Sequence, residues 1–278
     1  MSARKVAFLT GASRGIGRGC ALELAKRGFD LVLTARTVTG RERHDWSSTV
    51  KRAATAPLPG SLEKTDEEAR ALGAEAFVRK LDLSVREDWP AAIDAALARF
   101  GRIDVLVNNG RYIGPGHMDA FEETPLELIE QMFVCNVFAP LHLIRLCLPT
   151  MKRQGGGIVI QVTSGAGEHE TDRPVGKGGW GLGYSITKAA FNRMVPGLAK
   201  ELRPHNVAVI GLMPGFVTTE RLVAEGGLGF DVSTGLPVEN PGRVCAMLAT
   251  ARDPMYFSGK DLHGPTFFQD HSLVDFGE

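Results

Sequence analysis

Short apolar runs alternate along this chain with longer segments of helical period, and this alternation constrains the possible folds more than any other feature. Each run has the length of one buried strand, and each intervening segment is long enough for a crossover helix. Strands connected in this way lie parallel in one sheet, with helices on both faces. The pattern predicts strands at residues 5–9, 30–34, 76–81, 105–107, 157–162 and 207–212, with a weaker final strand around Leu262.

The intervening segments predict helices at residues 15–27, 87–100, 126–152 and 184–203, the last two of which contain Pro149 and Pro196. A chain of 278 residues with 44% hydrophobic side chains can bury one large core, so we expect a single domain over residues 1–278. Two stretches exceed what α/β connections need, and we expect insertions at about 37–63 and 165–183. The glycine-rich segment at about 221–238 is expected to form a substrate lid.

The first apolar run leads directly into the glycine loop Thr10-Gly11-Ala12-Ser13-Arg14-Gly15-Ile16-Gly17. Strand, glycine loop and helix is the order that a diphosphate site needs. Glycines let the backbone approach the ligand closely, and a helix N-terminus presents free amide groups to anionic oxygens. The loop therefore predicts a dinucleotide site in a doubly wound, Rossmann-type α/β fold, the alternative being a tight turn without a ligand.

The second apolar run ends at Ala35 and Arg36, where an NAD site would place a carboxylate against the ribose hydroxyls. A carboxylate would repel a 2′-phosphate, whereas Arg36 can pair with it. Arg14, inside the glycine loop, offers a second bidentate contact to the same phosphate. We therefore expect NADP(H) as the cofactor; the alternative is that both arginines are solvated surface residues.

Tyr184 and Lys188 lie one helical turn apart, on the same face of a predicted helix. A free tyrosine, with a pKa of about 10, exchanges protons poorly near neutrality, but a fixed cation nearby stabilises tyrosinate. The pair is therefore a candidate acid/base device. Ser164, at the end of a predicted strand, is the candidate hydrogen-bond donor to the same substrate oxygen, with Thr163 as its competitor.

With these motifs in this order, the chain resembles the short-chain dehydrogenase/reductase family over nearly its whole length. The resemblance implies catalytic roles for Asn136, Ser164, Tyr184 and Lys188. Tyr184 would be the acid/base and Ser164 would orient the substrate oxygen. Lys188 would also bond the nicotinamide ribose, and Asn136 would hold a water that relays protons to Lys188.

The resemblance also implies an adenine contact near Asp82, contacts after the fourth strand at Asn108-Asn109, and a nicotinamide-binding segment at residues 214–219. The full set of expected cofactor contacts is Gly11, Ser13, Arg14, Gly15, Ile16, Gly17, Arg36, Asp82, Leu83, Asn109, Gly110, Tyr184, Lys188, Pro214, Gly215, Val217 and Thr219. Two of the assigned residues have structural alternatives, since Asp82 can cap a helix and Asn136 can make a purely structural hydrogen bond.

The activity that these residues imply is the interconversion of a ketone or aldehyde and an alcohol by hydride transfer, on a small or medium, partly apolar substrate. Two alternatives remain open: a regulatory protein that binds NADP(H) without turnover, and an NAD-dependent alcohol dehydrogenase of the same family. A methyltransferase could share the glycine loop but would have no use for the tyrosine and lysine. The resemblance further implies a homo-oligomer, a dimer or tetramer, formed through helices around residues 132–148 and 184–202.

The chain departs from the family pattern at two places. Arg111 stands near the expected cofactor cleft where the family has a small residue, and we expect it to point outward; the alternatives are contact with an acidic part of the substrate or with a phosphate. The interval from Ser164 to Tyr184 is unusually long, and its Trp180 is expected to form a wall of the substrate pocket. Residues 168–172, which are acidic and include a histidine, are expected to form a solvated turn rather than a metal site.

Charge and composition set the classes of partner. The 32 basic and 32 acidic side chains cancel, so we expect no binding to nucleic acid or to an anionic membrane. The four cysteines have no metal-binding spacing and are expected to be small buried hydrophobes. We expect neither a signal peptide nor a membrane span, and therefore a cytoplasmic protein with small-molecule partners and no metal.

Overall fold

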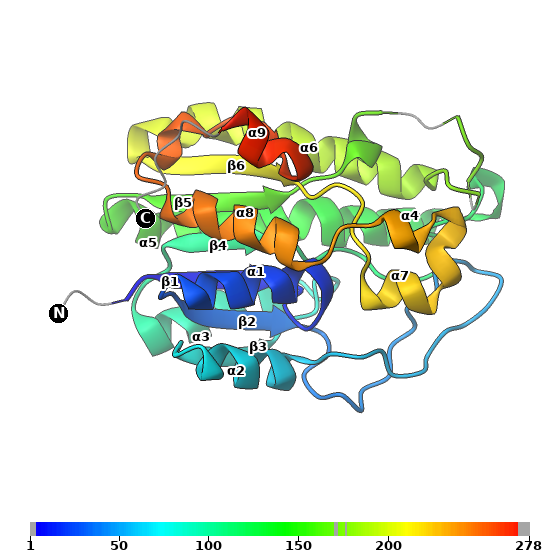
Figure 1. The fold of residues 1–278 in the computed structure, drawn as a ribbon, viewed down its shortest axis with the longest axis horizontal. Coiled ribbons are helices and arrows are strands. Elements are labelled where there is room, and N and C mark those ends of the chain that lie inside the picture. Colours follow the sequence, from blue (N-terminus) through cyan, green and yellow to red (C-terminus); the bar gives the residue numbers. More distant parts are fainter. Residues whose placement is uncertain (1–3, 170–171, 176, 272–278) are drawn as a thin grey trace.

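Seven parallel strands form one sheet in the computed structural model, which describes residues 4–169, 172–175 and 177–271. The strands are β1 (Val6–Thr10), β2 (Asp30–Ala35), β3 (Ala76–Lys80), β4 (Val105–Asn108), β5 (Gly157–Val162), β6 (Val207–Met213) and β7 (Asp261–His263). Their order in the sheet is β3-β2-β1-β4-β5-β6-β7 (Figure 1). All the strands expected from the sequence are present, including the weak last one.

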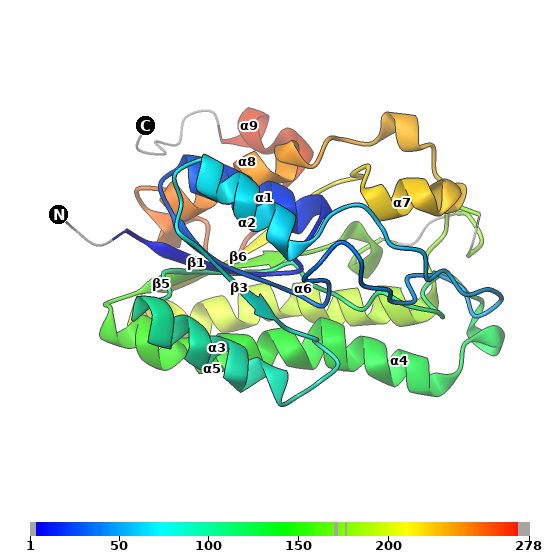
Figure 2. The same ribbon diagram turned by 90° about the horizontal axis from the view of Figure 1, so that it is seen from below.

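Helices cover both faces of the sheet, as Figure 2 shows. One face carries α1 (Gly15–Lys26), α2 (Leu62–Ala71) and α8 (Glu239–Thr250), and the other carries α3 (Asp88–Phe100), α5 (Ala139–Arg153) and α6 (Leu182–Leu202). Each face has its own apolar core: Leu24 and Val244 belong to the first, and Trp89 and Leu143 to the second. The doubly wound α/β class is therefore confirmed.

The remaining elements are short. They are α4 (Leu126–Phe133), α7 (Glu220–Ala224), α9 (Phe267–Asp270), the π-helical η2 (Val134–Phe138) and the 3₁₀ turns η1 (Phe121–Glu123), η3 (Gly165–Gly167), η4 (Arg203–His205), η5 (Gly226–Gly229), η6 (Val232–Thr234), η7 (Pro254–Tyr256) and η8 (Gly264–Thr266). The four cysteines are buried and free, as expected, and two of them, Cys20 and Cys245, interact where α1 packs against α8.

The helix expected over residues 126–152 is divided by η2 into α4 and α5. Pro149 and Pro196 lie inside α5 and α6 without ending them. By length and composition alone, the helical run Leu126–Arg153 could cross a membrane, so the expectation that no segment approaches a membrane span is wrong. Half of its apolar window is buried in the fold, and core helices of globular proteins pass the same test.

The longer helices α2 and α8 were not expected from the sequence, and neither were the short α7 and α9. Ser61 caps α2 by accepting a hydrogen bond from the Lys64 backbone amide at 3.2 Å, so the first expected insertion ends in a helix. The sequence of α2 hides the helix because it buries only Leu62, Thr65 and Ala69 among charged residues. The second expected insertion, residues 165–183, contains η3 and the start of α6, and its Glu170, Thr171 and Gly176 lie outside the described residues.

The order of the strands fixes where a ligand can bind. β1 pairs with β2 on one side and with β4 on the other, so successive crossovers leave β1 in opposite directions. At such a switch point the loops that follow neighbouring strands separate and leave a crevice beyond the carboxyl ends of the strands. The glycine loop follows β1 directly into this crevice.

Candidate functional site

A pocket of about 720 Å³ lies at this edge of the sheet. Ser164, Tyr184, Lys188 and the full set of expected cofactor contacts except Gly17 line it; Asn108, which is buried and bonded to Gln161, and Asn136 do not. Gly17 has a different use, because a Cβ there would lie 2.2 Å from the carbonyl oxygen of Gly11. It lets the first turn of α1 approach the glycine loop.

The end of β4 holds the glycine loop in place. Gly11 has a φ of +67°, and a Cβ there would lie 2.8 Å from the Asn109 side chain. That side chain donates hydrogen bonds to the carbonyl oxygens of Thr10 and Gly11, at 3.0 and 3.2 Å. The Thr10 hydroxyl accepts bonds from the backbone amides of Asn109 and Gly110, at 3.0 and 2.9 Å. The glycine loop, which continues from β1, is therefore also bonded to the end of β4, and these two strands border the crevice.

The N-terminus of α1 is matched to an anion, and a carboxylate of this chain meets it. The side chain of Arg14, the N-cap residue of α1, forms no hydrogen bond with the first amide groups of the helix. Instead the Gly15 amide donates a hydrogen bond to Glu220 Oε2 at 3.0 Å. Glu220 begins α7, far downstream, so nothing in the local sequence of the loop indicated this contact. Negative charge is stabilised at this position, where a phosphate oxygen would also bind.

Arg14 and Arg36 both line the pocket and are half-buried, so the alternative that they are solvated surface residues stays open. Arg14 donates hydrogen bonds to the main-chain oxygens of Pro59 and Gly60, at 2.9 and 2.8 Å. Arg36 donates one to the Ile113 carbonyl at 3.1 Å. Burial lowers the pKa of Arg14, and the Arg36 charge also contributes to this shift. Within the described residues neither arginine forms an ion pair, which leaves two cations side by side.

Asp82 both lines the pocket and stabilises a turn. Its Oδ1 accepts hydrogen bonds from the backbone amide and the hydroxyl of Ser84, at 2.9 and 2.7 Å, in the turn that precedes α3. Leu83, which follows it, is buried and also lines the pocket. Asp82 therefore does not cap α3, whose N-cap residue is Glu87, and the cofactor-contact interpretation stays a prediction.

Tyr184 and Ser164 meet at the opposite end of the pocket. The Tyr184 hydroxyl donates to Ser164 Oγ at 3.3 Å. Ser164 follows β5, and Tyr184 stands in the first turn of α6, so a strand and a helix fix the two groups. The Thr163 hydroxyl donates instead to Asp261 Oδ1 at 2.7 Å. Ser164, rather than its competitor Thr163, therefore shares the position of the tyrosine hydroxyl.

Lys188 is fully enclosed behind this pair. Its Nζ donates a hydrogen bond to the Val162 carbonyl at 2.9 Å. Burial lowers the pKa of Lys188 to about 7; the Arg111 charge adds to the shift and Asp261 opposes it. Asp261 on β7 was not expected from the sequence. Burial raises its pKa to about 6, and its Oδ2 has no hydrogen-bond partner among the described residues.

Asn136 lies in the π-helical segment, and its side chain joins two elements. Its Oδ1 accepts from the Tyr112 amide at 2.7 Å, and its Nδ2 donates to the Thr187 hydroxyl at 3.0 Å. This amide therefore connects the loop after β4 to α6 at the residue before Lys188. The geometry matches the structural alternative for this side chain, and the expected water relay stays a prediction.

Arg111 points into the pocket, so the expectation that it faces outward is wrong. Its Nη1 donates to the Tyr112 carbonyl at 2.9 Å and lies 3.5 Å from His117 Nδ1. Its Cζ stands 5.3 Å from the centre of the Tyr184 ring. The guanidinium is held inward because the Tyr112 backbone is fixed by Asn136 and the tyrosine face offers a cation–π contact.

Aromatic side chains form the wall beyond the tyrosine. The Trp180 ring centre lies 5.6 Å from that of Tyr184 and 4.9 Å from that of Phe230, which in turn lies 5.4 Å from Phe216. The interpretation of Trp180 as a pocket wall is confirmed. Leu222, Leu228 and Phe230 of the expected lid also line the pocket.

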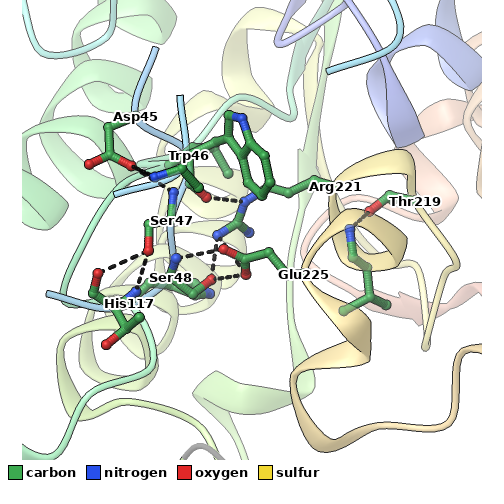
Figure 3. A network of polar contacts seen from close by, with 12 residues as sticks. Asp45, Trp46, Ser47, Ser48, His117, Thr219, Arg221 and Glu225 are labelled. Atoms are coloured by element: carbon green, nitrogen blue, oxygen red, sulfur yellow. Dashed lines mark hydrogen bonds and ion pairs between the residues drawn. The ribbon is translucent and has the colours of Figure 1, made fainter. Parts of the chain in front are cut away.

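The long loop between β2 and α2 lines the pocket, and Figure 3 shows its polar contacts with Arg221 and Glu225. Arg221 Nε donates to the Trp46 carbonyl at 3.1 Å, and the Ser48 amide donates to Glu225 Oε1 at 2.6 Å. Arg221 and Glu225 form an ion pair at 3.5 Å inside the protein. Burial lowers the pKa of Arg221 to about 10. This buried network holds the loop against α7. The charged, proline-containing sequence of the loop did not indicate these contacts.

No group of three or more histidine, cysteine or acidic side chains that could hold a metal ion occurs within residues 4–169, 172–175 and 177–271. His169 lines the pocket and lies 3.8 Å from the Glu168 carboxylate.

A model of the family described as short chain dehydrogenase matches residues 5–56 and 46–226. The chain is 30% identical to cyclohexanol dehydrogenase of Rhodococcus sp. (strain TK6) over 219 residues, which cover 78% of this chain and 76% of that protein. A metagenomic short-chain oxidoreductase in complex with NADP has a TM-score of 0.72 and 28% identity, covering 94% and 97% of the two chains. A 7 alpha-hydroxysteroid dehydrogenase complexed with NADH and 7-oxo glycochenodeoxycholic acid has a TM-score of 0.76 and covers 94% and 92%; at 23% identity it shows the fold alone.

Proposed function

The chain belongs to the short-chain dehydrogenase family and is an oxidoreductase, and we propose that it uses NADP(H) to interconvert a ketone or aldehyde and an alcohol, with Tyr184 as the acid/base. The observation that carries this proposal is the meeting of Tyr184 and Ser164 at 3.3 Å, at one end of a pocket whose other end holds the glycine loop and two arginines.

The residues at the glycine loop fit a dinucleotide phosphate. Gly11 and Gly17 let the loop, the end of β4 and the first turn of α1 pack closely, because a Cβ at either position would collide with protein atoms, and the Gly15 amide already meets a carboxylate oxygen. Arg14 and Arg36 both line the pocket and their charges act on each other, which suits a 2′-phosphate better than an unmodified ribose. Asp82, Asn109, Gly110 and the segment 214–219 complete the lining. When bound, the cofactor supplies or accepts the hydride at the carbonyl carbon.

At the other end, the chain's own residues handle the proton. Negative charge develops on the substrate oxygen during reduction, so the hydroxyls of Tyr184 and Ser164 would bind that oxygen and Tyr184 would give it a proton. In the reverse direction Tyr184, as tyrosinate, would take the alcohol proton. Lys188 would bring positive charge behind the tyrosine, and Asn136 would act as a positioning residue through Thr187.

The alternative cofactor is NAD(H), and one similar structure contains NADH while another contains NADP. The arginine at the end of β2, where a carboxylate would favour NAD(H), supports NADP(H). The alternative of a nucleotide-binding regulator without turnover is less well supported, because it gives no reason for the tyrosine, serine and buried lysine to converge. The homo-oligomer and the cytoplasmic location stay predictions; exposed Phe138 and Ile186, on the two expected contact surfaces, support the former.

The test compares wild type with Tyr184→Phe in the oxidation of NADPH and NADH, using ketones, aldehydes, quinones and steroids as substrates. We expect turnover with NADPH, and a loss of about 10³-fold in kcat in the variant. The Kd for NADPH, measured by fluorescence titration, should change by less than about twofold because the phenyl ring remains. Tyr256→Phe removes a hydroxyl from an exposed tyrosine and serves as the control. Turnover that survives Tyr184→Phe, or a preference for NADH, would contradict the proposal.

A further inference from the structure

Arg111 places a cation inside the apolar, reacting end of the pocket. The guanidinium lies 5.3 Å from the centre of the Tyr184 ring, while Trp180 and Phe230 form the neighbouring wall. A cation beside apolar side chains loses hydration, and it is held there only by contacts that replace water. The contacts given for this side chain are one carbonyl, one imidazole nitrogen and one aromatic face.

These contacts leave the positive charge of Arg111 without a counter-charge. In the part of the chain that the structure describes, no carboxylate lies within ion-pair distance of it. His117, its nearest titratable neighbour, is buried, and burial together with the charges of Arg111, Arg221 and Lys188 holds its pKa well below its usual value. The imidazole is therefore neutral and accepts from the arginine without balancing its charge.

Two further cations face the same region. Lys188 donates a hydrogen bond to a main-chain carbonyl, and the charge of the Asp261 carboxylate partly offsets the lowering of its pKa. Arg221 has its own partner, Glu225, at 3.5 Å. Among the described residues, neither Lys188 nor Arg111 forms an ion pair with a carboxylate, whereas Arg221 does. Of the first two, only Arg111 has the planar fork that matches a carboxylate in two parallel hydrogen bonds.

We propose that Arg111 binds a carboxylate of the substrate, so that the preferred substrates are keto acids, and the corresponding hydroxy acids, with an apolar body. The carboxylate pairs with the guanidinium while the carbonyl oxygen meets Tyr184 and Ser164 and the apolar body packs on Trp180 and Phe230. This inference rests on the proposed function, and it gives Arg111 a role in specificity. The cofactor phosphates remain at the other end, with Arg14, Arg36 and the N-terminus of α1.

The test uses pairs of substrates that differ in the charge of one group, with a methyl group added where the charge is removed. Benzoylformate and 4-oxo-4-phenylbutanoate are compared with their methyl esters, which keep the ketone and the phenyl ring and cover two spacings of carboxylate and carbonyl. We expect kcat/KM to favour the acid in at least one pair. In Arg111→Gln the ratio of acid to ester should fall about 50-fold, because the charge-assisted bonds are lost. Arg111→Lys, which keeps the charge without the fork, should retain part of the preference.

Arg86→Gln is the matched control, since Arg86 also lies 5.3 Å from an aromatic ring, that of Trp89, but is exposed outside the pocket. Benzoate and benzamide binding to the NADPH-loaded protein, measured by calorimetry, gives a readout without turnover: Arg111→Gln should weaken benzoate alone. Esters reduced at least as well as acids would overturn the inference and leave the proposed function intact. An equal loss for acid and ester in Arg111→Gln, or a weaker NADPH affinity with an unchanged ratio, would also overturn it. Absence of turnover with every substrate would instead count against the proposed function, while the benzoate measurement would still decide the role of Arg111.

Discussion

Cations at both ends of the pocket donate hydrogen bonds to main-chain carbonyls, and the two ends differ in what else surrounds these cations. At the reacting end, Lys188 is buried with a lowered pKa and Arg111 faces the tyrosine without a carboxylate in ion-pair distance among the described residues. At the glycine-loop end, Arg14 and Arg36 are bonded to main-chain carbonyls and Glu220 already meets the helix N-terminus. At the reacting end, cations lie close to the tyrosine that would exchange the proton. At the cofactor end, the arginines and the helix N-terminus already have protein partners, which a bound phosphate must replace.

The largest effect is expected from removing the buried charge at the reacting end. Lys188→Met should lower kcat by about 10²- to 10³-fold, because the tyrosine loses the cation behind it. Lys260→Met is the control, since Lys260 also stands over a tyrosine, with Nζ 3.7 Å from the centre of the Tyr256 ring, but outside the pocket. Steady-state kinetics with NADPH measure both. If kcat in Lys188→Met stayed within threefold of wild type, the two ends would not differ in the way described.

The comparison of wild type with Lys188→Met also tests a predicted dependence of the free energy of unfolding on pH. Burial lowers the pKa of Lys188 to about 7 in the folded protein, from 10.5 for an exposed lysine. Between these two values the unfolded chain binds more protons than the folded one, so this group makes the free energy of unfolding rise with pH, by at most about 1.4 kcal/mol per pH unit. Wild type should therefore gain stability relative to Lys188→Met between pH 7 and pH 10, as measured by urea denaturation. A constant difference over that range would show that the lysine is not buried as described.

At the glycine-loop end, Arg36→Ala tests the phosphate assignment. We expect the Kd for NADPH to rise about 30-fold at low salt, because one charge-assisted contact is lost, while the Kd for NADH changes by less than about twofold. The difference should shrink as salt is added, since exposed charges are screened. Arg79→Ala, on the neighbouring strand β3 and exposed, should leave both values unchanged. An equal loss for the two cofactors would assign Arg36 to something other than the 2′-phosphate.

The sequence predicted the parts of the site that short, local patterns determine. The glycine loop, Ser164 and the Tyr184/Lys188 pair each combine a residue type with a place at the end of a strand or on a helix, and the sheet then brings them together. The first six strands were found for the same reason, since each contains a short apolar run, whereas β7 has a single apolar residue and gave only a weak signal.

The groups that the sequence did not predict are those placed by contacts between distant segments. Glu220 reaches the first turn of α1 across 205 positions, and Arg221 and Glu225 clamp Ser48 across more than 170. Arg111 was expected to face outward because a long cation beside a cleft is usually solvated; its orientation depends on the Asn136 bond to Tyr112 and on the face of Tyr184. Such choices are decided by packing rather than by local propensity.

The smallest effect concerns Glu220, and it tests the cofactor end directly. Its carboxylate bonds to the Gly15 amide and acts on the charges of Arg14 and Arg18, so a bound diphosphate would meet negative charge there. Glu220→Gln keeps an oxygen that can accept from Gly15 and removes the charge. We expect NADPH to bind about fivefold more tightly, and the cofactor-free protein to lose about 0.3–1 kcal/mol of stability because the helix dipole loses its counter-charge. Glu239→Gln removes another acid that acts on Arg18 but has no bond to Gly15. It should change the NADPH affinity and the stability less than Glu220→Gln does. Weaker NADPH binding in Glu220→Gln, measured by fluorescence titration, would mean that the carboxylate assists the cofactor, and the two ends would then be organised alike.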